Sequence, residues 1–151
     1  MTDGGTRWAN ALLSGLAGAT ALTLVHESVR RIRSDAPRMD TLGRRAIASG
    51  MEAVGIEPPA GDEMQAVALA GDMVSNTLFY ALVGLGKPSG AIARGAALGA
   101  VAGLGAATLP PLMGLGHRPG ARTTQTAVMT VGWYLAGGLA AGAAHRLLTS
   151  R

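Results

Sequence analysis

The stretch that decides the fold is AIARGAALGAVAGLGAATLPPLM, which covers residues 91–113. From Gly95 to Gly116 no residue carries a formal charge. This window holds 22 residues, and a helix needs roughly 20 apolar residues to cross a bilayer. Gly95, Gly99 and Gly103 recur at every fourth position, so they lie on one ridge of a helix, where missing side chains let a second helix approach closely. We therefore predict a membrane span with a glycine packing face.

The rest of the chain alternates between long apolar stretches and short polar connections. Its mean hydropathy is only +0.29, because Ala and Gly replace bulkier apolar residues. A soluble domain of alanine-rich helices is the alternative, but such helices seldom leave two uncharged windows of this length. We predict an all-α integral membrane protein in which residues 1–151 form one domain, a bundle of four transmembrane helices. The predicted spans cover about residues 8–30, 64–85, 91–109 and 123–144.

The connections also carry structural signals. The Pro110-Pro111 pair ends the third span, because proline removes a backbone donor and clashes with the preceding turn, and hydroxyls in residues 123–126 suit the start of the last helix. The tight connection at 84–88 predicts that spans two and three pair as an antiparallel hairpin. Between spans one and two, Asp40 can cap an amphipathic helix over about residues 40–54. We predict that this helix lies in the membrane interface; a short helix folded over the bundle end is the alternative.

Small residues recur on the other spans as well. Gly15 and Gly18 lie in the first span, and Gly138 and Gly142 lie in the last. Helices with so little bulk need close packing, either within the bundle or between copies. We therefore expect a homo-oligomer, or the docking of another membrane subunit.

The charge pattern and composition exclude several function classes. Twelve Arg, one Lys and nine acids give a net charge of +4, and six of the Arg lie between Arg30 and Arg45. Acids are threaded through that run without stacking aromatics, so we expect anionic lipid headgroups there and no nucleic acid. The absence of Cys excludes disulfides and thiolate chemistry. Catalytic, dinucleotide and His-rich metal motifs are absent too, so we predict no enzyme, no cofactor and no metal site.

Asp72 is the ionisable residue of the second span. An ionised side chain at mid-membrane costs about 2.5 to 3.5 kcal/mol on insertion scales, so it tends to persist where it is used. Gln65, Asn76 and Tyr80 follow roughly the same helix face. This polar stripe is a candidate transport or proton site. The alternative is a structural role, in which a neighbouring span satisfies Asp72 by hydrogen bonds.

A second candidate group ends the first span, where His26, Glu27, Arg30 and Arg31 follow one another closely. Glu27 and Arg31 are four residues apart and can pair on one helix face. His titrates near neutral pH, so His26 beside Glu27 is a candidate pH-sensitive gate. Simple pairing at an exposed helix end is the alternative.

Short motifs of the chain resemble a known family. Pro111-Leu112-Met113-Gly114-Leu115 follows the third span, and Glu27 at the end of the first is followed by Ala36-Pro37-Arg38. These strings resemble the YagU-like family of small bacterial inner-membrane proteins. The resemblance implies a location in the bacterial cytoplasmic membrane.

Three function classes fit these patterns, the third of which is an intramembrane enzyme. We expect a structural or accessory membrane subunit that packs through its small-residue faces. The alternative is a small channel, or a proton- or ion-coupled transporter, built around Asp72.

Overall fold

The computed structural model describes residues 4–116 and 120–150, and within these ranges the chain is helical and has no β-strand. Four of its helical segments are long and apolar enough to cross a membrane, as the sequence predicted. The helices are α1 (Gly4–Ile32), α2 (Met39–Ala53), α3 (Gly61–Ala81), α4 (Ala91–Thr108) and α5 (Thr124–Thr149), with short 3-10 turns η1 (Leu82–Gly84) and η2 (Pro88–Gly90) between α3 and α4.

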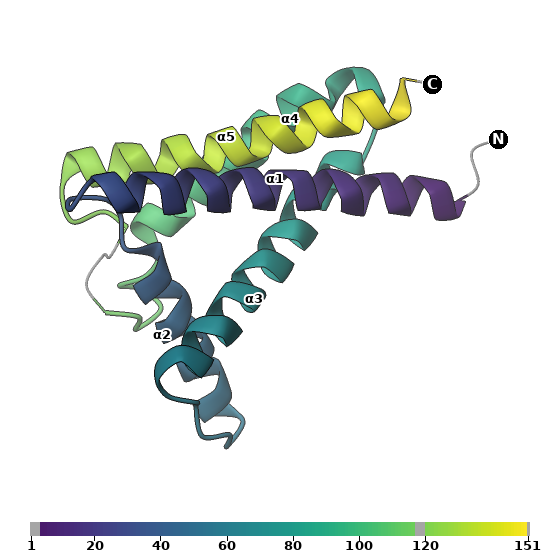
Figure 1. Cartoon of the computed structure of the whole chain (residues 1–151). Helices are drawn as coiled ribbons and strands as arrows, with labels where there is room; N and C mark the ends of the chain where they lie inside the picture. The colour runs from purple at the N-terminus through teal and green to yellow at the C-terminus, as the bar shows by residue number, and fades with distance from the viewer. Residues whose placement is uncertain (1–3, 117–119, 151) are drawn as a thin grey trace.

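The helices form an open row. α5 packs between α4 and α1, and α3 packs against α1 and also contacts α5 through Tyr80 near its C-terminal end. Figure 1 shows α1, α4 and α5 side by side, while α3 crosses α1 obliquely and projects away from this layer together with α2. The predicted hairpin of spans two and three is therefore wrong: α3 and α4 share few contacts, and each has its main partner elsewhere.

Glycines on facing helices explain why α4 pairs with α5. A methyl group placed on Gly95 would overlap the carbonyl of Gly138, and one placed on Gly99 would lie 2.5 Å from the carbonyl oxygen of Tyr134. Gly103 faces the Val131 Cα, at 2.7 Å from such a methyl group. The three glycines of the ridge are all buried. The backbones of α4 and α5 thus approach more closely than side chains would allow.

Two glycines of α1 pack against two different helices. A methyl group on Gly15 would overlap the carbonyl of Thr77 in α3, whereas one on Gly18 would lie 2.8 Å from the carbonyl of Gly137 in α5. In α5, Gly142 packs against Ala91 and Ile92 of α4. The small residues of α1 therefore hold it between α3 and α5.

The helix ends follow mostly local rules. α5 begins with a capping box in which Thr123 and Thr126 bond each other's backbone N–H, and α4 ends at Thr108, just before Pro110. The expectation for Asp40 is wrong: the N-cap of α2 is Arg38, without a side-chain cap. Asp40 lies in the first turn of α2 instead, where its side chain bonds Arg30 of α1.

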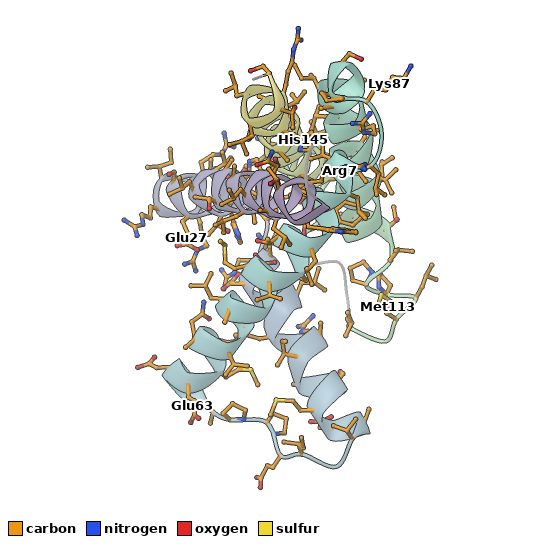
Figure 2. The ribbon with its side chains drawn as sticks, turned by 90° about the vertical axis from the view of Figure 1, so that its right-hand side faces the viewer. Arg7, Glu27, Glu63, Lys87, Met113 and His145 are labelled. Carbon is orange, nitrogen blue, oxygen red and sulfur yellow. The ribbon has the colours of Figure 1, made fainter. Side chains whose placement is uncertain are left out.

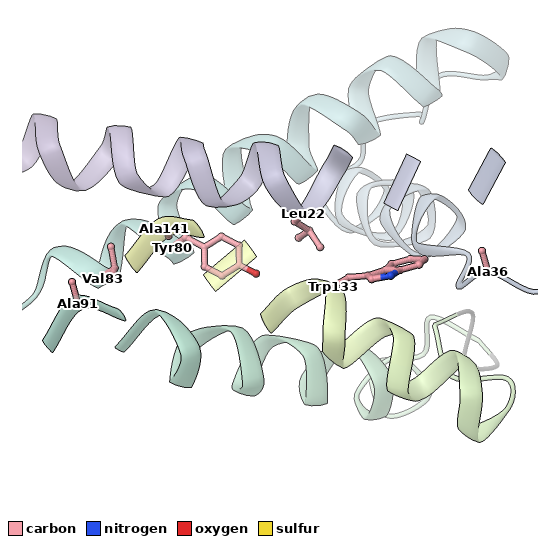
Figure 3. Packing of buried hydrophobic residues seen from close by; sticks show 7 residues of the cluster. All are labelled: Leu22, Ala36, Tyr80, Val83, Ala91, Trp133 and Ala141. Carbon is pink, nitrogen blue, oxygen red and sulfur yellow. The ribbon is translucent and has the colours of Figure 1, made fainter. Parts of the chain in front are cut away.

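The core is thin. Figure 3 shows its larger buried side chains, among them Leu22, Tyr80 and Trp133 between α1 and α5. Many large apolar side chains lie on the outside instead. Those more than half exposed include Leu13, Leu24, Val74, Leu78, Val101, Leu104 and Val128.

Candidate functional site

A polar cavity of about 40 Å³ lies where α1, α2 and α3 meet. This volume is enough for a few water molecules, since one needs roughly 10–15 Å³ of such space. Three carboxylates and one imidazole belong to its wall. The lining residues are Thr23, His26 and Glu27 of α1, Met39, Asp40 and Gly43 of α2, and Gln65, Ala68, Leu69 and Asp72 of α3.

Asp72 lies at the middle of its own helix but next to a residue near the end of α1. It is in the middle of α3, but it faces the cavity beside His26, which is six residues, about 9 Å, from the end of α1. The oblique crossing of α3 produces this offset. Asn76 donates its amide to the Asp72 side chain at 2.9 Å and to the Asp72 carbonyl at 3.0 Å.

The residues of the predicted polar stripe of α3 contact different helices. Gln65 lines the cavity and accepts a hydrogen bond from Arg44 of α2 at 3.5 Å. Tyr80 is fully buried, and its hydroxyl donates to the main-chain carbonyl of Tyr134 in α5 at 2.7 Å. Tyr80 thus joins α3 to α5 and is not part of the cavity wall.

His26 stacks on an aromatic ring of α5. Its ring centroid lies 5.2 Å from that of Trp133, with 31° between the planes. The Nε2 atom of His26 is buried and has no hydrogen-bond partner among the residues that the structure describes, and the same holds for Oδ1 of Asp40. Buried polar atoms are nearly always satisfied in native proteins, so each exception calls for an explanation such as water, an ion or a chemical role. Two such atoms belong to residues that line this one cavity.

Arg30 connects the acids at the cavity mouth. It donates two hydrogen bonds to Glu27, at 3.0 and 3.1 Å, and one to Asp40 at 3.5 Å. The predicted pairing of Glu27 with Arg31 is therefore wrong, because the three-residue spacing to Arg30 is the one that faces α2. Arg31 is exposed.

The cluster has more negative than positive groups. Glu27, Asp40 and Asp72 supply three carboxylates, and Arg30 supplies one permanent cation. His26 adds a second cation only when it is protonated. Within residues 4–116 and 120–150, no group of three or more His, Asp or Glu side chains is arranged to hold a metal ion. The cavity thus brings titratable side chains of three helices together.

Sequence reasoning missed the residues that distant elements contribute. Asp40 was expected to cap α2, and Trp133 carried no signal for a contact with His26, from which it is 107 positions away. At the other end of α1, buried Ser14 and His145 lie 3.2 Å apart across 131 positions. No local pattern could have revealed these pairs, since they depend on which helices become neighbours.

The strings that resemble the YagU-like family lie in connections beside the helices. The Leu115 carbonyl accepts a hydrogen bond from Arg45 of α2 at 3.0 Å, and the Ala36 carbonyl accepts one from Arg122 at 3.4 Å. Compared with known proteins, the chain matches no family model, no curated protein and no solved structure. The resemblance stays a prediction.

Proposed function

We propose that this chain is an integral membrane protein that takes up and releases protons at the cavity between α1, α2 and α3. The membrane location is supported by four apolar helices of sufficient length and by the large apolar side chains on their outer faces, which are typical of a surface that meets hydrocarbon. The bacterial cytoplasmic membrane is the expected location, on the resemblance of residues 111–115.

The observation that carries the proton site is the convergence of ionisable groups from three helices on one cavity. His26, Asp40 and Asp72 come from α1, α2 and α3. His26 and Asp40 each have a buried polar atom that finds no partner within the described residues. An intramembrane ionisable residue that faces a polar cavity is typical of proton and ion pathways.

The charge balance suits proton exchange. With His26 neutral, one cation faces three carboxylates; with His26 protonated, two cations do. The groups that act on His26 come from every helix around the cavity: Glu27 and Arg30 of α1, Asp40 of α2 and Asp72 of α3, with the Trp133 ring of α5 stacked on it. Asn76 holds the Asp72 side chain by a direct hydrogen bond.

Proton flux into liposomes tests this proposal. The purified protein is reconstituted around a pH-sensitive dye, and a potassium gradient with valinomycin drives protons inward. We expect wild-type liposomes to acidify faster than protein-free ones, and Asp72→Asn to reduce the rate to the protein-free value. Asp62→Asn is the matched control, because Asp62 is an exposed acid at the start of the same helix. The proposal is overturned if Asp72→Asn keeps the wild-type rate, or if wild-type liposomes acidify no faster than empty ones.

A structural or accessory role is the second candidate, and the open row of helices favours it. The glycine faces of α4 and α5 pack on each other, so they leave no glycine ridge of that pair for a partner. The outer face of α3 is available instead: Val74 and Leu78 are 61% and 57% exposed. Assembly between copies would use this face.

Cross-linking in native membranes tests the second role. The chain has no Cys, so Val74→Cys and Leu78→Cys each introduce a single thiol. We expect disulfide-linked dimers from both variants and none from Val128→Cys, an equally exposed position on α5. Monomer alone from all three variants contradicts assembly through α3.

A further inference from the structure

A second and larger cavity, of about 1000 Å³, opens at the opposite end of the molecule. The first turns of α1, the connection between α3 and α4, and the last turns of α5 form its wall. Figure 2 looks at this end and shows Arg7, Lys87 and His145 close to its centre and upper edge. All three residues line the cavity.

The wall of this cavity is basic. It includes Arg7 and Lys87 and, among the residues that the structure describes, no acidic one. The sequence explains the asymmetry: eight of the nine acids lie between Glu27 and Asp72, and the ninth, Asp3, lies outside the described residues. Neutral polar residues complete the wall, since Thr6, Asn10 and Thr149 also line it.

Arg94 fixes the connection that carries Lys87. Its guanidinium donates to the Val83 carbonyl at 2.9 and 3.1 Å and to the Lys87 carbonyl at 2.9 Å. Gly86 beside it has a φ of 106°, a backbone conformation that favours glycine. These bonds hold in place the main chain at Lys87, a residue of the cavity wall.

Four basic residues at the other end of the molecule have partners within the chain. Arg30 pairs with Glu27 and Asp40, and Arg33 pairs with Asp35. The side chains of Arg44 and Arg45 bond Gln65 and the Leu115 carbonyl. The long basic run, which looked like the lipid-binding segment, is thus largely engaged within the chain. The sparser cations at Arg7 and Lys87 line a cavity instead.

We propose that this second cavity binds an anionic phospholipid. Its ligand is the headgroup phosphate, whose negative charge no other group of the lipid neutralises. Guanidinium and ammonium groups are the usual phosphate ligands, and basic pockets between membrane helices bind anionic headgroups. Leu147 and Leu148 belong to the same wall and give an apolar surface along which an acyl chain can lie. A soluble phosphate would share the polar contacts but would not use this apolar surface.

Ligand binding by the full chain in an uncharged detergent tests this proposal. Native mass spectrometry is used to compare short-chain phosphatidylglycerol, short-chain phosphatidylcholine and inorganic phosphate. We expect phosphatidylglycerol to bind most tightly. Each cation near a headgroup contributes about five-fold in affinity. The Arg7→Gln/Lys87→Gln double variant should therefore bind phosphatidylglycerol about 25-fold more weakly. Arg44→Gln/Arg45→Gln removes the same charge at the other end and should stay within about two-fold of wild type.

The outcomes separate the two sources of phosphate. If inorganic phosphate displaces phosphatidylglycerol at equal concentration, the site takes soluble phosphate and the lipid assignment is overturned. Equal loss in the two double variants, or equal binding of phosphatidylcholine, overturns the site itself. Circular dichroism of each variant checks folding. If Arg7→Gln/Lys87→Gln does not fold, the salt dependence of wild-type binding decides: phosphatidylglycerol binding should weaken as NaCl increases, and an unchanged affinity overturns the site.

Discussion

In the α4–α5 hairpin, glycines of one helix lie directly against the backbone of the other, whereas in the α2–α3 hairpin, side chains make the contacts. Gly95 and Gly99 in α4 have no room for a methyl group. Between α2 and α3, the corresponding contact is the end of the Ile47 side chain, 2.9 Å from a methyl group placed on Gly71. No residue of α2 is fully buried.

This difference separates the tightly packed pair α4–α5 from the polar cavity, which α2 and α3 form together with α1. The contacts of Gly95 and Gly99 with α5 are made with main-chain atoms of Gly138, Gly142, Tyr134 and Leu135, so the two backbones touch directly. Side-chain contact between α2 and α3 leaves a cavity against α1, and ionisable groups of all three helices line it. One hairpin fixes positions by close packing, and the other supplies groups that can exchange a proton.

Glycine-to-alanine variants should give the largest contrast. Gly99→Ala places a methyl group 2.5 Å from the Tyr134 carbonyl, and we expect it to lower the free energy of unfolding by about 2 kcal/mol, because overpacking costs typically 1–3 kcal/mol. Gly132→Ala, on the same helix pair, meets nothing within 4 Å and should stabilise by up to about 1 kcal/mol through helix propensity. Unfolding in mixed detergent micelles, followed by circular dichroism, measures both.

Gly71→Ala extends this contrast to the α2–α3 hairpin. The obstacle there is the end of a flexible side chain, so the change in unfolding free energy should be small compared with that of Gly99→Ala. Equal destabilisation by Gly99→Ala and Gly71→Ala would remove the distinction between the two hairpins.

The link between the two parts should give an intermediate effect. Tyr80→Phe removes the hydroxyl that bonds the Tyr134 carbonyl at 2.7 Å, and loss of a buried hydrogen bond costs about 1 kcal/mol. Ser75→Ala removes an exposed hydroxyl from the same helix and should change the unfolding free energy by less than about 0.5 kcal/mol. The same unfolding assay compares the two variants; similar values would mean that Tyr80 does not hold α3 to α5.

The smallest effect concerns the exposed ion pair between α1 and α2. Arg33 donates to Asp35 at 2.8 and 2.9 Å, and these bonds hold the pKa of Asp35 below its ordinary 3.8. The pair therefore stabilises the folded chain above that ordinary pKa, and this contribution disappears as the pH falls through the lower folded-state value. Carboxyl NMR titration of Arg33→Gln should show the Asp35 pKa returning upward. An unchanged pKa would mean that the pair does not form in solution.

Much of the helix pattern follows from local sequence. The four apolar segments were predictable because a bilayer crossing requires a minimum uncharged length, and α2 lies within two residues of its predicted bounds. Pro110 and Thr123 act on their own turns, so the end of α4 and the start of α5 were predictable as well. Asp72, His26 and Glu27 were identified as candidates because ionisable residues are rare in such segments.

Helix neighbours and the members of each cavity depend on the folded chain. A glycine at every fourth position marks a packing face, but the same face suits any helix with a matching gap. Gly95 could therefore meet Gly138 of this chain or a second copy, and periodicity alone does not distinguish them. In the fold, α5 takes that place and α3 crosses α1. That crossing brings Asp40 and His26 to Asp72, because long-range contacts are set by three-dimensional packing and leave no trace in local spacing.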